Sequence, residues 1–140
     1  MKRDIFSEFR LNGFTLKNRL GVAPMTRMSS VADSIPRQDV LDFLVRRAER
    51  GAALVFSEAL VTDYESAQGY PGQARLLTQR QIDAWRAVTE ALKAHGALSI
   101  MQMFHCGRVA WPGDPVRRVT TWADMSIPVR GTVIDPQPGP

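Results

Sequence analysis

The sequence predicts an α/β fold built around a parallel sheet. Three apolar runs of β type, at residues 20–25, at residues 52–56 and from residue 98 onward, alternate with two stretches of helical periodicity. Parallel strands need crossover connections of a dozen residues or more, and both helical stretches have this length. With a short N-terminal hairpin, the predicted order is hairpin, strand, helix, strand, helix, strand.

Length and composition indicate one globular domain. The 140 residues are 44% hydrophobic and 23% charged, which is typical of a folded soluble protein. The single cysteine, Cys106, excludes an internal disulfide and indicates a reducing compartment. Cys106, His95 and His105 are the only soft metal ligands, so we expect no metal site.

Neither a membrane nor a nucleic acid is expected as a partner. The N-terminus lacks the apolar region of a signal peptide, and no stretch approaches about eighteen apolar residues. We therefore expect a cytoplasmic protein. The net charge of +4 is modest, and the basic residues are scattered, whereas nucleic-acid binding favours a basic stripe interleaved with aromatic residues.

The first half of the chain contains the hairpin and the first helix. Asn12-Gly13, between two short patches in residues 5–18, is a strong hairpin signal. Gly51 is a natural residue to end the first helix. The apolar residues that share one face of this helix are Val40, Leu41, Leu44, Val45 and Ala48.

The second helix has a clear start signal. Thr78 and Gln81 have the spacing of a capping box, and His95 and Gly96 are suited to end the helix. The apolar face between them consists of Ile82, Trp85, Val88 and Leu92.

Polar side chains follow or end each predicted strand. Thr26 follows the first, Glu58 the second, and Gln102 and His105 close the third. The carboxyl ends of parallel strands face one rim of the sheet, where α/β enzymes hold their ligands. A hydroxyl, a neutral amide and an imidazole at this rim suit the edge of a polar planar ring.

Each of these residues also has a purely structural interpretation. Thr26 would cap a turn, Glu58 would pair with an arginine or cap a helix, and His105 would be a structural histidine. Gln102 is harder to explain in this way, because an unsatisfied amide inside an apolar run costs roughly 1–3 kcal/mol.

Other enzyme signatures are missing, and the chain changes character after Trp111. There is no G-x-G-x-x-G, Walker or G-x-S-x-G motif. Six of the nine prolines lie in the last 29 residues. We therefore predict an ordered part at residues 1–111 and a loop-like tail at residues 112–140.

Taken together, the motifs resemble the old yellow enzyme family, whose members are FMN-containing (β/α)₈ barrels that reduce activated carbon–carbon double bonds with NADH or NADPH. The resemblance covers about residues 5–111, with the motifs in the family's order. These motifs are Leu16-Lys17-Asn18-Arg19-Leu20, Ala23-Pro24-Met25-Thr26-Arg27, Ser57-Glu58-Ala59, Gly69-Tyr70-Pro71-Gly72 and Gln102-x-x-His105-x-Gly107-Arg108.

The resemblance implies a cofactor site and a role for each of its residues. Pro24 and Met25 would lie against the flavin, and the Thr26 hydroxyl would sit at a carbonyl edge of its ring. Ala59 would bring its backbone to the ring, and Gln102 would bind the pyrimidine end. No catalytic residue is assigned, and Arg27, His105 and Arg108 mark the family without a direct role.

Three departures from the family pattern limit this expectation. Phe43-Leu44 stand where relatives often carry two tyrosines, and Met125-Ser126-Ile127-Pro128 match the family poorly. Only three of the family's eight strands are predicted. The substrate-binding His/Asn or His/His pair, the tyrosine proton donor, an arginine beside the flavin and the phosphate loops would lie in the missing part.

Two interpretations of the function follow from these departures. The first is an N-terminal fragment of an FMN-dependent ene-reductase, inactive alone, whose substrate class is a small electrophilic alkene. The second is a non-catalytic remnant or split half-barrel that acts by associating with a complementary chain or with a second copy. A basic binding module is a third, and we expect it to be wrong.

Overall fold

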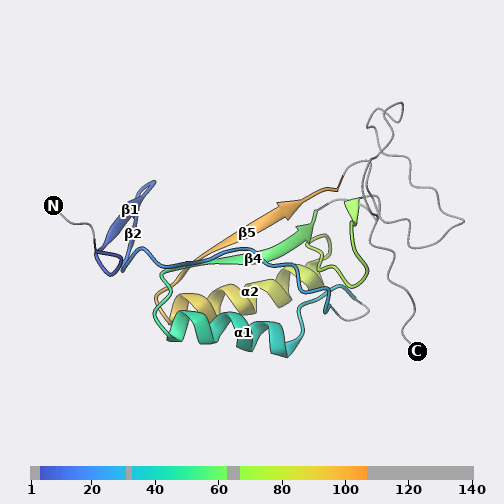
Figure 1. The fold of residues 1–140 in the computed structure, drawn as a ribbon. Helices are drawn as coiled ribbons and strands as arrows, with labels where there is room; N and C mark the ends of the chain where they lie inside the picture. Colours follow the sequence, from blue (N-terminus) through green and yellow to red (C-terminus); the bar gives the residue numbers. More distant parts are fainter. Residues whose placement is uncertain (1–3, 31–32, 63–66, 107–140) are drawn as a thin grey trace, which may run out of the picture.

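A three-stranded parallel sheet with both helices on one face forms the centre of the fold (Figure 1). The structure is a computed structural model and describes residues 4–30, 33–62 and 67–106. The strands, in their order across the sheet, are β3 (Gly21–Val22), β4 (Leu54–Val61) and β5 (Leu98–Phe104). The crossovers contain α1 (Gln38–Glu49) and α2 (Gln79–Ala94). The predicted α/β order is confirmed.

The N-terminal hairpin is separate from this sheet. Strands β1 (Phe9–Leu11) and β2 (Phe14–Leu16) pair antiparallel. Asn12 and Gly13 turn between them with φ of 43° and 87°, as a two-residue hairpin loop requires. In Figure 1 the hairpin lies near the end of the sheet at which β4 and β5 begin, away from their carboxyl ends.

The hydrophobic core lies between the sheet and the helices. Trp85, Val88 and Leu92 of α2 are almost fully buried, as predicted, but Ile82 is 36% exposed. The buried position one turn before Trp85 belongs to Gln81, because its side chain is needed at the start of the helix. The core cluster consists of Val40, Leu44, Ala48, Ala52, Val55, Leu60, Ala74, Trp85, Val88, Leu92 and Ala97.

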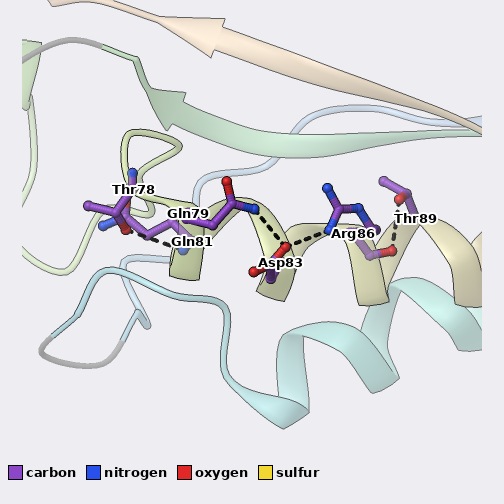
Figure 2. A network of polar contacts seen from close by, with 6 residues as sticks. All are labelled: Thr78, Gln79, Gln81, Asp83, Arg86 and Thr89. Atoms are coloured by element: carbon purple, nitrogen blue, oxygen red, sulfur yellow. Dashed lines mark hydrogen bonds and ion pairs between the residues drawn. The ribbon is translucent and has the colours of Figure 1, made fainter.

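The capping box at the start of α2 is confirmed (Figure 2). The Gln81 amide N–H donates to Thr78 Oγ1 at 3.3 Å, and the Thr78 amide N–H donates to Gln81 Oε1 at 3.1 Å. Gln81 Nε2 also donates to the Asp33 carbonyl at 2.9 Å, which ties the helix start to a distant loop. Figure 2 shows the polar contacts continuing along the helix through Asp83, which accepts hydrogen bonds from the side chains of Gln79 and Arg86.

Two predicted strand boundaries were wrong. The first strand ends at Val22 rather than at residue 25, because Pro24 has no N–H to continue a ladder. The second strand does not end at Phe56 but continues to Val61. The predicted tail at residues 112–140 and the boundary at residue 111 lie outside the described residues. No helix in the described part of the chain is long and apolar enough to cross a membrane.

Replacing Thr78 by Ala is expected to lower the free energy of unfolding by about 1 kcal/mol, because the helix loses its N-cap oxygen. Urea unfolding followed by circular dichroism measures the change. Thr89→Ala is the matched control, since the Thr89 hydroxyl only donates to the Arg86 carbonyl within α2. Alanine favours a helix interior, so Thr89→Ala should cost nothing. Equal losses in the two variants would contradict the assigned cap.

Candidate functional site

The site lies at the carboxyl ends of β3, β4 and β5, and a shift in register builds it. Strands β4 and β5 pair Phe56 with Ile100, and then pair Ala59 with Gln102 after an irregularity. Val55 and Leu60 both belong to the core cluster, although a regular strand would place residues five apart on opposite faces. The extra residue therefore resets which side chains of β4 face the core.

Ser57 fills the gap that the register shift opens. Its Oγ accepts the Gln102 amide N–H at 2.9 Å and donates to the Glu58 carbonyl at 2.8 Å. The buried hydroxyl thus replaces a missing ladder contact between the two strands. This bridging is why polar residues continue the strand instead of ending it, and it fixes the backbone of Gln102.

Ala59 and Gln102 meet in register, as a common site requires. Ala59 is 4% exposed, whereas the Gln102 side chain is half-buried. The backbone N–H of Gln102 binds Ser57, but its side-chain amide makes no hydrogen bond within the part of the chain that the structure describes. Partial exposure removes the desolvation cost expected for a buried amide, so its donors and acceptor are available to water or to a ligand.

Pro24, Met25 and Thr26 follow β3 as an exposed segment without regular structure. Met25 is 46% exposed, a large value for an apolar side chain beside the core. The Thr26 hydroxyl has no hydrogen bond among the described residues, so the turn-capping interpretation finds no support there.

Glu58 connects this segment to β4. Glu58 is 3% exposed, and its Oε2 accepts the Arg27 amide N–H at 3.2 Å. Oε1 is buried and has no hydrogen-bond partner within the described part of the chain. Burial raises the pKa of Glu58, while the hydrogen bond from Arg27 and the charge of Arg27 oppose that increase. The expected arginine partner is therefore present, but through its backbone amide.

Gln73 is a site residue that sequence reasoning missed. It is completely buried, with Nε2 donating to the Ala59 carbonyl at 3.2 Å and Oε1 accepting the Gly69 amide N–H at 2.9 Å. No spacing pattern in the sequence marks Gln73 as a site residue. Its neighbour Ala74 is also buried, but only the structure shows this. Gln73 holds the loop after β4 against the site.

Gly72 lets the same loop approach the segment after β3. It has a φ of 64°, and a Cβ added to it would lie 2.8 Å from the Met28 carbonyl oxygen. Its own carbonyl accepts the Ser30 amide N–H at 3.0 Å. Only glycine satisfies both the backbone conformation and the close contact.

The other residues of the predicted motifs, at the end of β5 and beyond, add little to the site. His105 directly follows β5 and is exposed, and the Cys106 thiol donates to the Gln68 carbonyl at 3.1 Å. Gly107 and Arg108 lie outside the described residues. Within residues 4–30, 33–62 and 67–106, no group of three His, Cys, Asp or Glu is arranged to hold a metal.

Comparisons with known proteins agree on one family. The model of the NADH:flavin oxidoreductase / NADH oxidase family matches residues 4–124. The chain belongs to this family. It is 35% identical to the flavin oxidoreductase hxnT of Emericella nidulans over 94% of the chain, and 34% identical to 12-oxophytodienoate reductase 1 of Oryza sativa subsp. japonica over 76%. The crystal structure of old yellow enzyme from Pichia sp. AKU4542 aligns with a TM-score of 0.72 at 29% identity and covers 77% of the chain.

The chain spans only part of the length of its relatives. It covers 34% and 27% of the two curated proteins and 28% of the Pichia enzyme. The old yellow enzymes are (β/α)₈ barrels, and the parallel α/β sheet described here is consistent with part of such a barrel. Members of the family use FMN and take electrons from NADH or NADPH.

The residues at the rim fit an FMN ring in their chemistry. The Gln102 amide offers donors and an acceptor at once, and Thr26 adds a hydroxyl. Met25 adds an exposed apolar surface on which a flat ring could lie.

Replacing Gly72 by Ala is expected to destabilise the chain more than replacing Gly96 by Ala. The two glycines have φ of 64° and 66°, so both variants carry the left-handed penalty of about 1–2 kcal/mol. At Gly96 the nearest atom to an added Cβ is Lys17 Nζ at 3.9 Å, whereas at Gly72 it is the Met28 backbone. Urea unfolding should show an additional loss of about 1 kcal/mol or more for Gly72→Ala. A difference near zero would mean that the close contact is not important.

Replacing Glu58 by Gln is expected to change the pH dependence of stability. Because the pKa of Glu58 is raised in the folded state, the folded chain binds the extra proton above the ordinary Glu pKa of about 4.3. Protonation of Glu58 contributes to the free energy of unfolding of the unaltered chain. That contribution is fully present below the ordinary Glu pKa and is lost as the pH rises through the raised pKa. Glu58→Gln has no such loss, so its advantage in the free energy of unfolding should grow from about pH 4 to about pH 7.

Urea titrations at both pH values measure this difference. Glu90→Gln removes the same formal charge from the exposed face of α2 and is the control. An advantage of Glu58→Gln that is constant with pH, or that shrinks as pH rises, would contradict the prediction.

Proposed function

We propose that the chain builds the early-strand part of the FMN site in an NAD(P)H-dependent oxidoreductase of the ene-reductase type. The observation that carries the proposal is the register pairing of Ala59 with Gln102 beside the exposed segment of Pro24, Met25 and Thr26. These are the five residues that the family resemblance assigns to the flavin. The proposed substrates are small alkenes activated by a neighbouring electron-withdrawing group.

Each residue has a separate role in this proposal. The Gln102 amide would hold the pyrimidine end of the ring, and the Thr26 hydroxyl would donate at a carbonyl edge. Ala59 would allow the backbone of β4 to approach the ring, with Pro24 and Met25 against its face. The chemistry that bound FMN would supply is hydride transfer from NADH or NADPH to the alkene. Fixed donors at the ring's edge favour the negative charge that builds there.

We also propose that the 140-residue chain does not catalyse this reaction alone. It spans about a third or less of the length of the relatives described above. The sheet in the described part has three parallel strands, whereas the family barrel has eight. The family's substrate-binding pair and tyrosine proton donor are assigned to none of the described residues.

A specific observation favours the second candidate function, association with a complementary half-barrel. Strand β3 is an edge of the sheet in the described part of the chain, and a groove of about 560 Å³ runs between it and α1. Arg46, Arg47 and Arg50 line this groove, and none of them forms an ion pair with a described carboxylate. An open edge with unpaired arginines suits a partner that brings a strand and acidic side chains.

The purified chain, mixed with FMN, NADPH and cyclohexenone, is expected to reduce no more cyclohexenone than free FMN does. The reason is that three of eight strands cannot enclose the substrate. Product formation, followed by gas chromatography, is compared with the same mixture lacking the chain.

Turnover that rises in proportion to the chain's concentration would contradict the proposed inactivity. Size-exclusion chromatography of the same preparation separates the two candidate functions. Defined oligomers support association, and a monomer with a sharp thermal transition speaks against it.

A further inference from the structure

Glu58 is placed where an apolar residue would be expected. It lies inside β4, adjacent to Ala59, and is 3% exposed. Its Oε1 has no hydrogen-bond partner among the described residues, so this part of the fold carries the cost of an unsatisfied buried polar atom. Because packing alone would favour a hydrophobic side chain here, the carboxylate calls for another explanation.

The hydrogen bond that Glu58 accepts is the main tie on the segment after β3. The pairing of β3 with β4 is recorded only for Gly21 and Val22. Beyond that pairing, the bond from the Arg27 amide to Glu58 Oε2, at 3.2 Å, is the only hydrogen bond recorded for residues 23–28 within the described part of the chain. Without it, the segment would lose its backbone attachment to β4.

The Arg27 side chain supplies a second anchor to the same point. Its guanidinium carbon lies 4.3 Å from the centre of the Phe43 ring in α1, within the range of a cation–π contact. Met25, Arg27, Phe43 and Glu58 all line one small cavity. Arg27 is therefore held through both its backbone and its side chain, while Thr26 beside it stays exposed.

We propose that Glu58 is a positioning residue whose carboxylate fixes the Arg27 amide and thereby holds Pro24, Met25 and Thr26 in place for the flavin. This inference rests on the proposed FMN site. It adds a residue that would not touch the cofactor and that acts through Arg27. Strand β4 would then contribute two residues to the site. Ala59 would lie at the ring, and Glu58 would hold the neighbouring segment from behind.

The first measurement follows amide hydrogen exchange by NMR in the full 140-residue chain. Glu58→Ala is expected to abolish the protection of the Arg27 amide, and Glu58→Gln is expected to keep it, because the Gln oxygen still accepts the bond. The Val88 amide, in the core of α2, reports whether each variant remains folded. Continued protection of the Arg27 amide in Glu58→Ala would overturn the proposal.

The second measurement is FMN affinity, followed by the quenching of flavin fluorescence. Glu58→Ala is expected to weaken binding by about tenfold, roughly the effect of losing one hydrogen bond. Glu58→Gln should restore affinity to within about twofold of the unaltered chain. If Glu58→Ala weakened FMN binding only by destabilising the fold, the protection of the Val88 amide would fall along with the affinity. Glu58→Gln would then not restore the affinity. Unchanged affinity in a Glu58→Ala variant that has lost Arg27 protection would overturn the positioning role.

The two proposals fail in distinguishable ways. If the unaltered chain does not bind FMN, the proposed cofactor site is wrong for this chain. The exchange measurement then still decides whether Glu58 holds the segment after β3.

Discussion

The register shift between β4 and β5 at Ser57 and Glu58 is the constraint on which the site depends. A parallel ladder without it would pair other residues and would turn Leu60 away from the helices. With it, the core stays continuous on both sides of the shift and Ala59 lies opposite Gln102. The Ser57 hydroxyl makes this possible, because it accepts the hydrogen bond of the Gln102 backbone N–H where the ladder is interrupted.

Two polar residues, one in β4 and one in the loop after it, attach the neighbouring segments to β4. Glu58 binds the Arg27 amide on the β3 side, and Gln73 binds the Ala59 carbonyl from the loop after β4. Gly72 then brings that loop into contact with the backbone of Met28. The rim is thus supported by side chains and close backbone contacts behind it. The Thr26 hydroxyl and the Gln102 side-chain amide, which would face a ligand, have no hydrogen-bond partner among the described residues.

The core and the site occupy different parts of the sheet. Both helices pack on one face, where Trp85 and Leu60 are buried, and a well-packed core of this kind stabilises the strands (Figure 1). The carboxyl ends lie beyond that packing, and there Met25 and Thr26 are exposed. Such a division suits the family's chemistry, since a rigid scaffold can present polar groups whose hydrogen bonds are left for a cofactor.

The sequence by itself determined the elements and their order. Asn12-Gly13 specifies the hairpin, Thr78 and Gln81 specify the start of α2, and Gly96 ends it, because each acts through backbone geometry within a few residues. The five proposed flavin residues were also named from sequence, through their family motifs. Only the tertiary structure decided where β4 ends, that Gln81 rather than Ile82 is buried, and what Glu58 and Gln73 bind. The bonds that join Glu58 to Arg27, Gln73 to Ala59 and Gln81 to Asp33 span 31, 14 and 48 residues, and contacts at such separations leave no local period in the sequence.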